Sequence, residues 1–99
     1  MTLLRRLHPL ARRDLAEVMG FYRAEAGVGL ARRFVNELDR VVKMLSAAPV
    51  LGTPVDDWRR AFPLRGFPYT LIYRPTDASI RILVIRHQSR DPEFGDQRR

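Results

Sequence analysis

The sequence predicts an α+β domain in which an N-terminal helical hairpin packs on one face of an antiparallel sheet of three or four strands. Two amphipathic helical patterns fill the first half of the chain, and a glycine joint separates them. Strand-like alternation fills the last third. The length of 99 residues and the hydrophobic content of 45% suit one ordinary core, so we expect a single domain over residues 1–99 with a frayed polar tail at 95–99.

The first helix is predicted to begin at Pro9 and to run to Ala26. Before it, residues 3–7 alternate apolar and basic side chains, which favours a short edge strand. Proline suits the first helical position because the N–H it lacks would be unpaired there. The apolar residues that follow share one helical stripe: Ala11, Leu15, Val18, Met19, Tyr22 and Ala26.

The second helix is predicted to begin near Val28–Ala31 and to end at Ser46–Pro49. Its apolar residues have the cleanest helical period in the chain, and Gly27 and Gly29 make a short joint with the first helix. Two long helices joined in this way favour an antiparallel hairpin. The stripe consists of Ala31, Phe34, Val35, Leu38, Val41, Val42 and Leu45.

A turn-rich loop over residues 49–57 separates the helices from the predicted sheet. Trp58–Phe62 then reads as a strand, with Trp58 and Phe62 on one face and Arg59 on the other.

Two longer strands follow, Phe67–Tyr73 and Ile80–Ile85. In the first, Phe67, Tyr69, Leu71 and Tyr73 share one face. The second is apolar on both faces at its centre, so we expect it to lie inside the sheet.

The composition limits the chemistry that the chain can carry. There is no cysteine, which excludes disulfides and thiol chemistry, and two histidines are poor support for a zinc site, so we expect no metal and no cofactor. Nothing reads as a signal peptide or a membrane span, so we expect a cytoplasmic protein without a membrane partner.

The positive charge is concentrated in the second half. The net charge is +7, and residues 58–99 hold nine arginines against four Asp or Glu, whereas residues 1–57 hold nine Lys or Arg against seven. We expect the helices to cover one sheet face and to leave the other face, with an edge carrying Arg65, Arg74, Arg86 and His87, open to an anionic partner.

Three segments in joint order and spacing resemble the RelE/ParE family of toxins from bacterial toxin–antitoxin operons. They are the helical pair with Phe34–Arg40 leading to Ser46–Pro49, the strand Phe67–Arg74, which is similar to a Y-x-Ω-x-Y-R pattern, and Ile82–Pro92, which is similar to a V-x-H-x-x-R-D-P ending. The resemblance spans roughly residues 3–93. The Arg-Asp-Pro ending favours the ParE-like branch, which implies a plasmid-stabilising type of toxin that inhibits DNA gyrase.

The resemblance also implies a partner. A cognate antitoxin would supply a small acidic segment that folds onto the toxin, giving a hetero-oligomer. We expect Arg59, Arg65 and Arg81 to bind the antitoxin. We expect the target to be bound by Arg65, Arg74, Arg86, His87 and Arg90.

Two other functions remain open from the sequence. A RelE-like enzyme that cuts messenger RNA on the ribosome needs an acid, a base and cations, for which His87, Tyr73, Arg65 and Arg86 are the candidates. Thr70, Gln88 and the absence of lysine beyond Lys43 depart from that pattern. A non-enzymatic nucleic-acid-binding module is the third possibility. For His87 the plain alternative is a hydrogen bond to the backbone, and for Tyr73 a place in the core.

Overall fold

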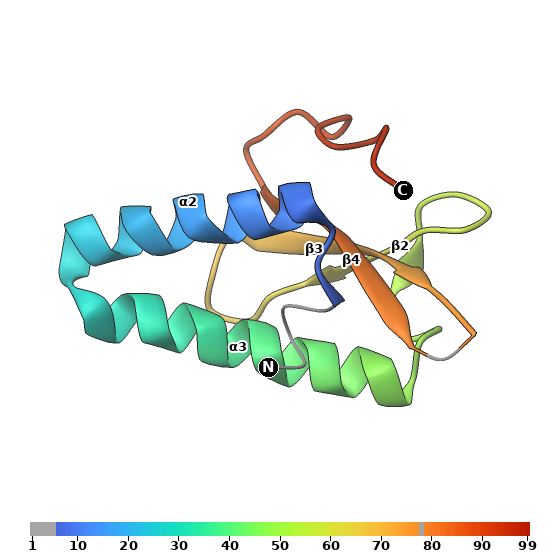
Figure 1. Ribbon diagram of the computed structural model, residues 1–99, viewed down its shortest axis with the longest axis horizontal. Coiled ribbons are helices and arrows are strands. Elements are labelled where there is room, and N and C mark those ends of the chain that lie inside the picture. Colours follow the sequence, from blue (N-terminus) through green and yellow to red (C-terminus); the bar gives the residue numbers. More distant parts are fainter. Residues whose placement is uncertain (1–5, 78) are drawn as a thin grey trace.

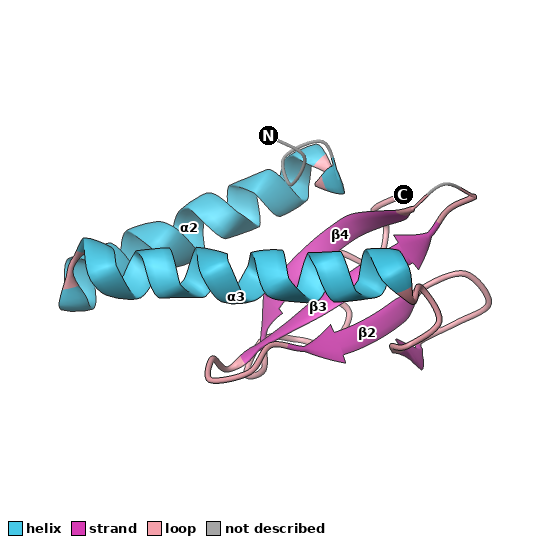
Figure 2. Cartoon of the chain, turned by 90° about the horizontal axis from the view of Figure 1, so that it is seen from below, coloured by secondary structure: helices cyan, strands magenta, loops and turns pink. Residues whose placement is uncertain are grey.

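The computed structural model describes residues 6–77 and 79–99. A helical hairpin comes first and a four-stranded antiparallel sheet follows, and the two helices lie side by side against the sheet (Figures 1 and 2). The α+β fold predicted from the sequence is confirmed. In chain order the elements are α2 (Pro9–Ala26), α3 (Val28–Ala47), β1 (Thr53–Pro54), β2 (Arg60–Pro63), β3 (Tyr69–Pro75) and β4 (Ile80–His87).

Both helices occupy the predicted ranges. Pro9 is at the start of α2, and the Nδ1 atom of His8 accepts a hydrogen bond of 3.0 Å from the Leu10 amide, which satisfies one unpaired donor of the first turn. Gly27 alone joins the helices, with a φ of 84°, a left-handed value that glycine adopts without strain. The helices therefore reverse direction within one residue.

The core between helices and sheet is rich in aromatic contacts. Phe34 of α3 is fully buried, and its ring lies 5.1 Å from the Phe67 ring and 5.4 Å from the Tyr69 ring. Edge-on contacts of this kind add to the gain from apolar burial. They attach the second helix to the start of β3, as the shared face of Phe67, Tyr69, Leu71 and Tyr73 predicted.

Strand β2 differs from the prediction in its start and in its faces. It begins at Arg60, so the alternation does not extend back to Trp58. Phe62 packs against the helix-side core, whereas Trp58 packs on the opposite face with Ile72. The prediction that Trp58 and Phe62 share a face is wrong for this reason. The region predicted as a loop also contributes the two-residue edge strand β1.

Strand β4 is an edge strand, which corrects the prediction that it lies inside the sheet. The strand order is β1-β2-β3-β4. Ile72 pairs with Val84 and Tyr73 with Ile82, so Leu83 is an extra residue that forms a bulge. Strict alternation ends there. β4 is apolar on both faces because both of its faces are covered.

A second, smaller core covers the sheet face opposite the helices. Ile72, Leu83 and Val84 form it, and Phe94 of the C-terminal segment packs against it. The expectation that this face stays open is therefore wrong at its centre, where the chain's own residues lie on it.

The C-terminal residues are anchored rather than frayed. Arg98 is buried, and its guanidinium donates to the Asp14 carboxylate at 2.6 Å and to the Leu83 carbonyl at 3.0 Å. The same Asp14 oxygen accepts the Ile85 amide at 3.0 Å. Gly95 has a φ of 82°, and a Cβ atom there would come within 2.5 Å of the Val84 side chain. A polar composition predicted a loose tail, but Arg98 has a buried partner far away in the sequence.

These contacts close the outer edge of β4. The His8 amide donates to the Ile82 carbonyl at 2.8 Å, and Leu7 forms a single parallel bridge with Ile82. Asp14 and Arg98 then satisfy the next main-chain groups, at Ile85 and Leu83. Residues 3–5 of the predicted N-terminal strand lie outside the described residues.

We expect the variant Arg98→Ala to lower the free energy of unfolding by about 3 kcal/mol, because it leaves the Asp14 carboxylate buried without its cation. Urea unfolding at neutral pH measures this. The matched control is Lys43→Ala, which breaks the exposed pair with Asp39 and should cost under about 1 kcal/mol. Equal losses in the two variants would contradict the anchored tail.

Candidate functional site

The arginines expected on one edge occupy two ends of the sheet. Arg86 lies opposite Thr70, whereas Arg74 lies opposite Arg81. Residues 70 and 74 are four positions apart on β3, which separates the two pairs by roughly 13 Å. We call the first group, with Arg65, Arg86, His87 and Arg90, the His87 end. We call the second group, with Trp58, Arg74, Arg81 and Arg99, the Trp58 end.

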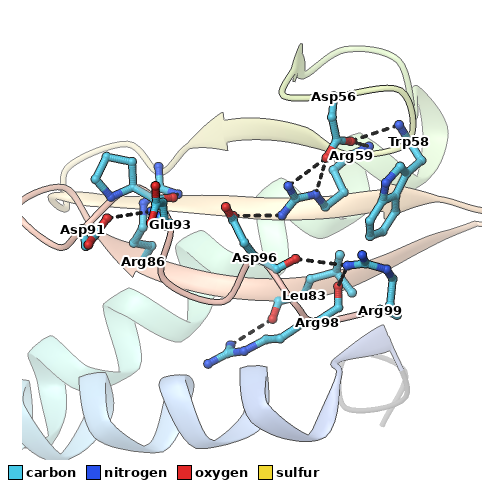
Figure 3. A network of polar contacts seen from close by, with 11 residues as sticks. Asp56, Trp58, Arg59, Leu83, Arg86, Asp91, Glu93, Asp96, Arg98 and Arg99 are labelled. Atoms are coloured by element: carbon cyan, nitrogen blue, oxygen red, sulfur yellow. Dashed lines mark hydrogen bonds and ion pairs between the residues drawn. The ribbon is translucent and has the colours of Figure 1, made fainter.

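Two arginines of the His87 end are held by the segment that follows β4. Arg86 donates to the Pro92 carbonyl at 3.0 Å (Figure 3). The Arg90 guanidinium lies 4.3 Å from the Phe94 ring centre. Neither contact involves a carboxylate, so both groups keep their positive charge available to a partner.

His87 is oriented by the turn after it. The amide of Ser89 donates to His87 Nδ1 at 3.0 Å, and the Ser89 hydroxyl lies 2.8 Å from the same atom. An amide can only donate, so Nδ1 is an acceptor and the neutral ring carries its proton on Nε2. The predicted plain alternative, a hydrogen bond to the backbone, is what the structure shows. His87 Nε2 can still donate to a bound partner.

A small cavity of about 210 Å³ lies beside His87, between α2 and the segment after β4. Asp14, Glu17 and Tyr69 line it together with His87 and Arg90. Burial raises the pKa of the Tyr69 hydroxyl. Asp14 is balanced by Arg98, so Glu17 is the lining carboxylate that opposes the entry of a phosphate group.

The four nuclease candidates do not converge. Tyr73 is fully buried; its hydroxyl accepts from the Gly52 amide at 2.9 Å and donates to the Pro49 carbonyl at 2.7 Å. The hydroxyl of Tyr73 therefore makes its donor and its acceptor hydrogen bond inside the fold. Tyr69 is the residue opposite His87, so Tyr73 lies roughly 13 Å further along the strand.

Arg65 is exposed in the turn between β2 and β3, and a carboxylate of α3 fixes this turn. Glu37 accepts the Arg65 amide at 2.6 Å and two hydrogen bonds of 2.8 Å from Arg40. These bonds, led by the Arg40 side chain, lower the pKa of Glu37 although its burial acts in the opposite direction.

Sequence reasoning missed Glu37 and Asp14 as structural residues. A signal was present, because each lies within an apolar stripe: Asp14 between Ala11 and Val18, and Glu37 between Phe34 and Val41. A carboxylate at such a position faces the core and must find a donor.

Arg59, expected to bind an antitoxin, is buried and already paired. It forms ion pairs with Asp56 at 2.8 Å and with Asp96 at 3.2 Å (Figure 3). Two carboxylates of its own chain balance its charge. Arg81 is half-buried and donates to the main-chain oxygen of Arg99 at 3.3 Å.

A third surface lies on the helical hairpin, and the sequence analysis did not identify it. An open, mostly apolar groove with a volume of about 340 Å³ runs between α2 and α3. Val28 at its end is 62% exposed. We call it the hairpin groove, and it is lined by Met19, Arg23, Val28, Ala31, Arg32 and Val35.

Two classes of site are not seen in the described part of the chain. Residues 6–77 and 79–99 bring together no group of three or more His, Asp or Glu side chains that could hold a metal ion. None of their helices has the length and hydropathy to span a bilayer.

The sequence and the fold match known toxins. The family described as ParE toxin of the type II toxin–antitoxin system parDE matches residues 5–92. Toxin ParE2 of Mycobacterium tuberculosis, in strains CDC 1551 / Oshkosh and ATCC 25618 / H37Rv, is 34% identical over 92 residues, covering 93% of this chain and 88% of the relative.

A solved structure agrees in fold. The chromosomal ParDE TA system from P. aeruginosa superposes with a TM-score of 0.70 over 82% of this chain and 90% of that one, at 23% identity. The chain belongs to the ParE toxin family, and it is a ParE-type toxin of a toxin–antitoxin system.

The lowered pKa of Glu37 predicts a pH dependence of stability. The unfolded chain binds a proton at this group near its ordinary value of 4.5, and the folded chain only at lower pH. The contribution of Glu37 is therefore complete above that value and is lost as the pH falls below it. In urea unfolding, Glu37→Gln should be clearly less stable than the parent at pH of about 7, and the gap should narrow towards pH of about 3. A gap that does not change with pH would contradict this assignment.

Proposed function

We propose that this toxin inhibits DNA gyrase by binding it, and that a cognate antitoxin neutralises the toxin by occupying the hairpin groove. The observation that supports gyrase binding over RNA cleavage is the burial of Tyr73. Its hydroxyl is buried with both hydrogen bonds satisfied, so the candidate set for RNA cleavage that includes Tyr73 is not assembled. Binding rather than hydrolysis is the action that suits the exposed groups.

The His87 end is the proposed target contact. Arg65 and Arg90 are exposed, Arg86 is half-buried without a carboxylate partner, and His87 can donate from Nε2. Arginine is enriched among residues that dominate binding energy at protein interfaces. Arg74 belongs to the other end of the sheet, so we leave it out of this contact.

The hairpin groove is the proposed antitoxin site. Its floor is apolar, and Arg23 and Arg32 belong to its lining. An amphipathic helix with acidic flanks would bury its apolar side there and place carboxylates near the arginines. Arg65 is not in the groove lining, and Glu37, which accepts its amide, points about 200° around α3 from Val35, so we leave Arg65 out of the antitoxin site. Arg81, on the opposite face of the sheet, is left out as well.

We expect the purified toxin to inhibit gyrase supercoiling, and transcripts in poisoned cells to stay uncut by primer extension. The double variant Arg86→Ala/Arg90→Ala should raise the concentration needed for inhibition by about tenfold or more. The control is Arg13→Ala, an exposed arginine of α2 outside this surface. Cut transcripts together with unimpaired supercoiling would refute the gyrase proposal.

We expect Val28→Glu/Arg32→Glu to abolish rescue by the antitoxin, because it places negative charge in the groove that an acidic segment must enter. The test is growth after co-expression with the cognate antitoxin, which we expect to be a small acidic protein encoded beside this gene. The toxin alone should still arrest growth. The control is Val55→Glu, an exposed valine of the β1–β2 loop, which should be rescued normally. Equal rescue of both variants would rule out the groove as the antitoxin site.

A further inference from the structure

The Trp58 end has cationic groups without carboxylate partners. Arg74 and Arg81 are directly opposite each other on β3 and β4. Like charges in this position destabilise a strand pair. Among the described residues neither forms an ion pair with an Asp or Glu side chain, and Arg81 donates to the main-chain oxygen of Arg99. The Arg99 guanidinium beside them donates to main-chain oxygens and lies against the Trp58 ring. The fold thus holds three guanidinium groups in a place where an anion from outside would relieve their repulsion.

The Trp58 ring contacts two of these three arginines. The guanidinium carbon of Arg99 lies 4.5 Å from its ring centre, and that of Arg74 lies 5.7 Å away (Figure 3 shows Arg99 next to the ring). Contacts between a cation and an indole ring fix the position of an arginine without neutralising it. The main chain of Trp58 is held by its amide, which donates to Asp56 Oδ1 at 3.1 Å, and the Arg59 guanidinium that pairs with Asp56 lies 5.1 Å from the ring centre.

A hollow adjoins this group. It has a volume of about 340 Å³, enough for a phosphate and its sugar, and Trp58, Arg60 and Arg74 are in its lining. Arg60 donates to the carbonyls of Val50 and Gly52, so it too keeps its charge. Of the two aspartates in the lining, Asp56 is paired with Arg59 and Asp57 is exposed to solvent, so three arginines of the lining (Arg59, Arg60 and Arg74) face two carboxylates.

We propose that the Trp58 end binds the phosphate backbone of duplex DNA directly. Arginine, with its planar fork of donors, pairs bidentately with phosphate, and three such groups in fixed positions suit a ligand with regularly spaced charges. An acidic helix would need an apolar floor, which the hairpin groove has and the Trp58 end does not. This inference goes beyond the proposed function, because the contact is between toxin and DNA and requires neither gyrase nor antitoxin.

The test compares two double variants of the full chain with equal loss of charge. Fluorescence anisotropy with a labelled duplex of about 20 base pairs, from about 50 to 200 mM salt, gives affinity and salt dependence. Arg74→Gln/Arg81→Gln should bind at least about tenfold more weakly, and the slope of log affinity against log salt should fall by about two. The control Arg13→Gln/Arg33→Gln removes two exposed helical arginines and should change affinity by less than about threefold.

Three results would overturn the proposal. The first is an equal loss of affinity for the duplex in both double variants, which would mean diffuse attraction by net charge. The second is displacement of the duplex by polyglutamate at equal charge concentration, which would mean that the site binds acidic polypeptide. The third is that the toxin does not bind the duplex at low salt. Thermal melting checks that each variant folds. If Arg74→Gln/Arg81→Gln does not fold, the exposed Arg99→Gln replaces it, with an expected loss of about threefold, and an unchanged affinity then overturns the proposal.

Discussion

The ion pair between Asp14 and Arg98 is the contact on which the arrangement of this small protein depends. It joins the first helix, the open side of β4 and the C-terminal segment in one buried place. A buried ion pair gives little net stability by itself, because both charges lose their hydration. Here the pair also satisfies an amide and a carbonyl of β4 that no strand pairs with. Without it, the edge of the sheet would lose its cover and the second core would lose the segment that carries Phe94.

The same contact explains why net charge is a poor guide to the functional surface. Arginines in this chain occupy distinct environments. Arg59 and Arg98 are buried and balanced by carboxylates, so they act as structural residues. Arg86 and Arg99 rest on main-chain oxygens and keep their charge. Arg74 is held by an aromatic ring alone among the contacts described. Arginines of the last two kinds can attract an anionic partner, and they are divided between the two ends of the sheet: Arg86 lies at the His87 end, and Arg74 and Arg99 lie at the Trp58 end.

Local patterns predicted the helices well, because periodicity and the Gly27 joint depend on neighbouring residues. They predicted the faces of the sheet less well. The bulge at Leu83 and the late start of β2 depend on how each strand pairs with its neighbour in the sheet, which the alternation within a single strand does not encode. Polar composition alone assigns Arg98 to a loose tail, because its partner, Asp14, is 84 positions away. The sequence does contain a signal, because Asp14 interrupts the apolar stripe of α2 and Glu37 that of α3. Of the candidate site, the separate residues were identifiable, but their division into two ends was not.

The brevity of β1 has a consequence for how this toxin behaves at high concentration. Its two residues end in Pro54, which has no amide hydrogen to offer a neighbouring strand. An exposed sheet margin is where identical molecules commonly stack into aggregates, and short, proline-bearing margins resist this. At the opposite margin, residues 7–8 and two side chains take the places that an incoming strand would need. Among the described residues, neither margin of the sheet offers a second copy of this protein a free edge to pair with.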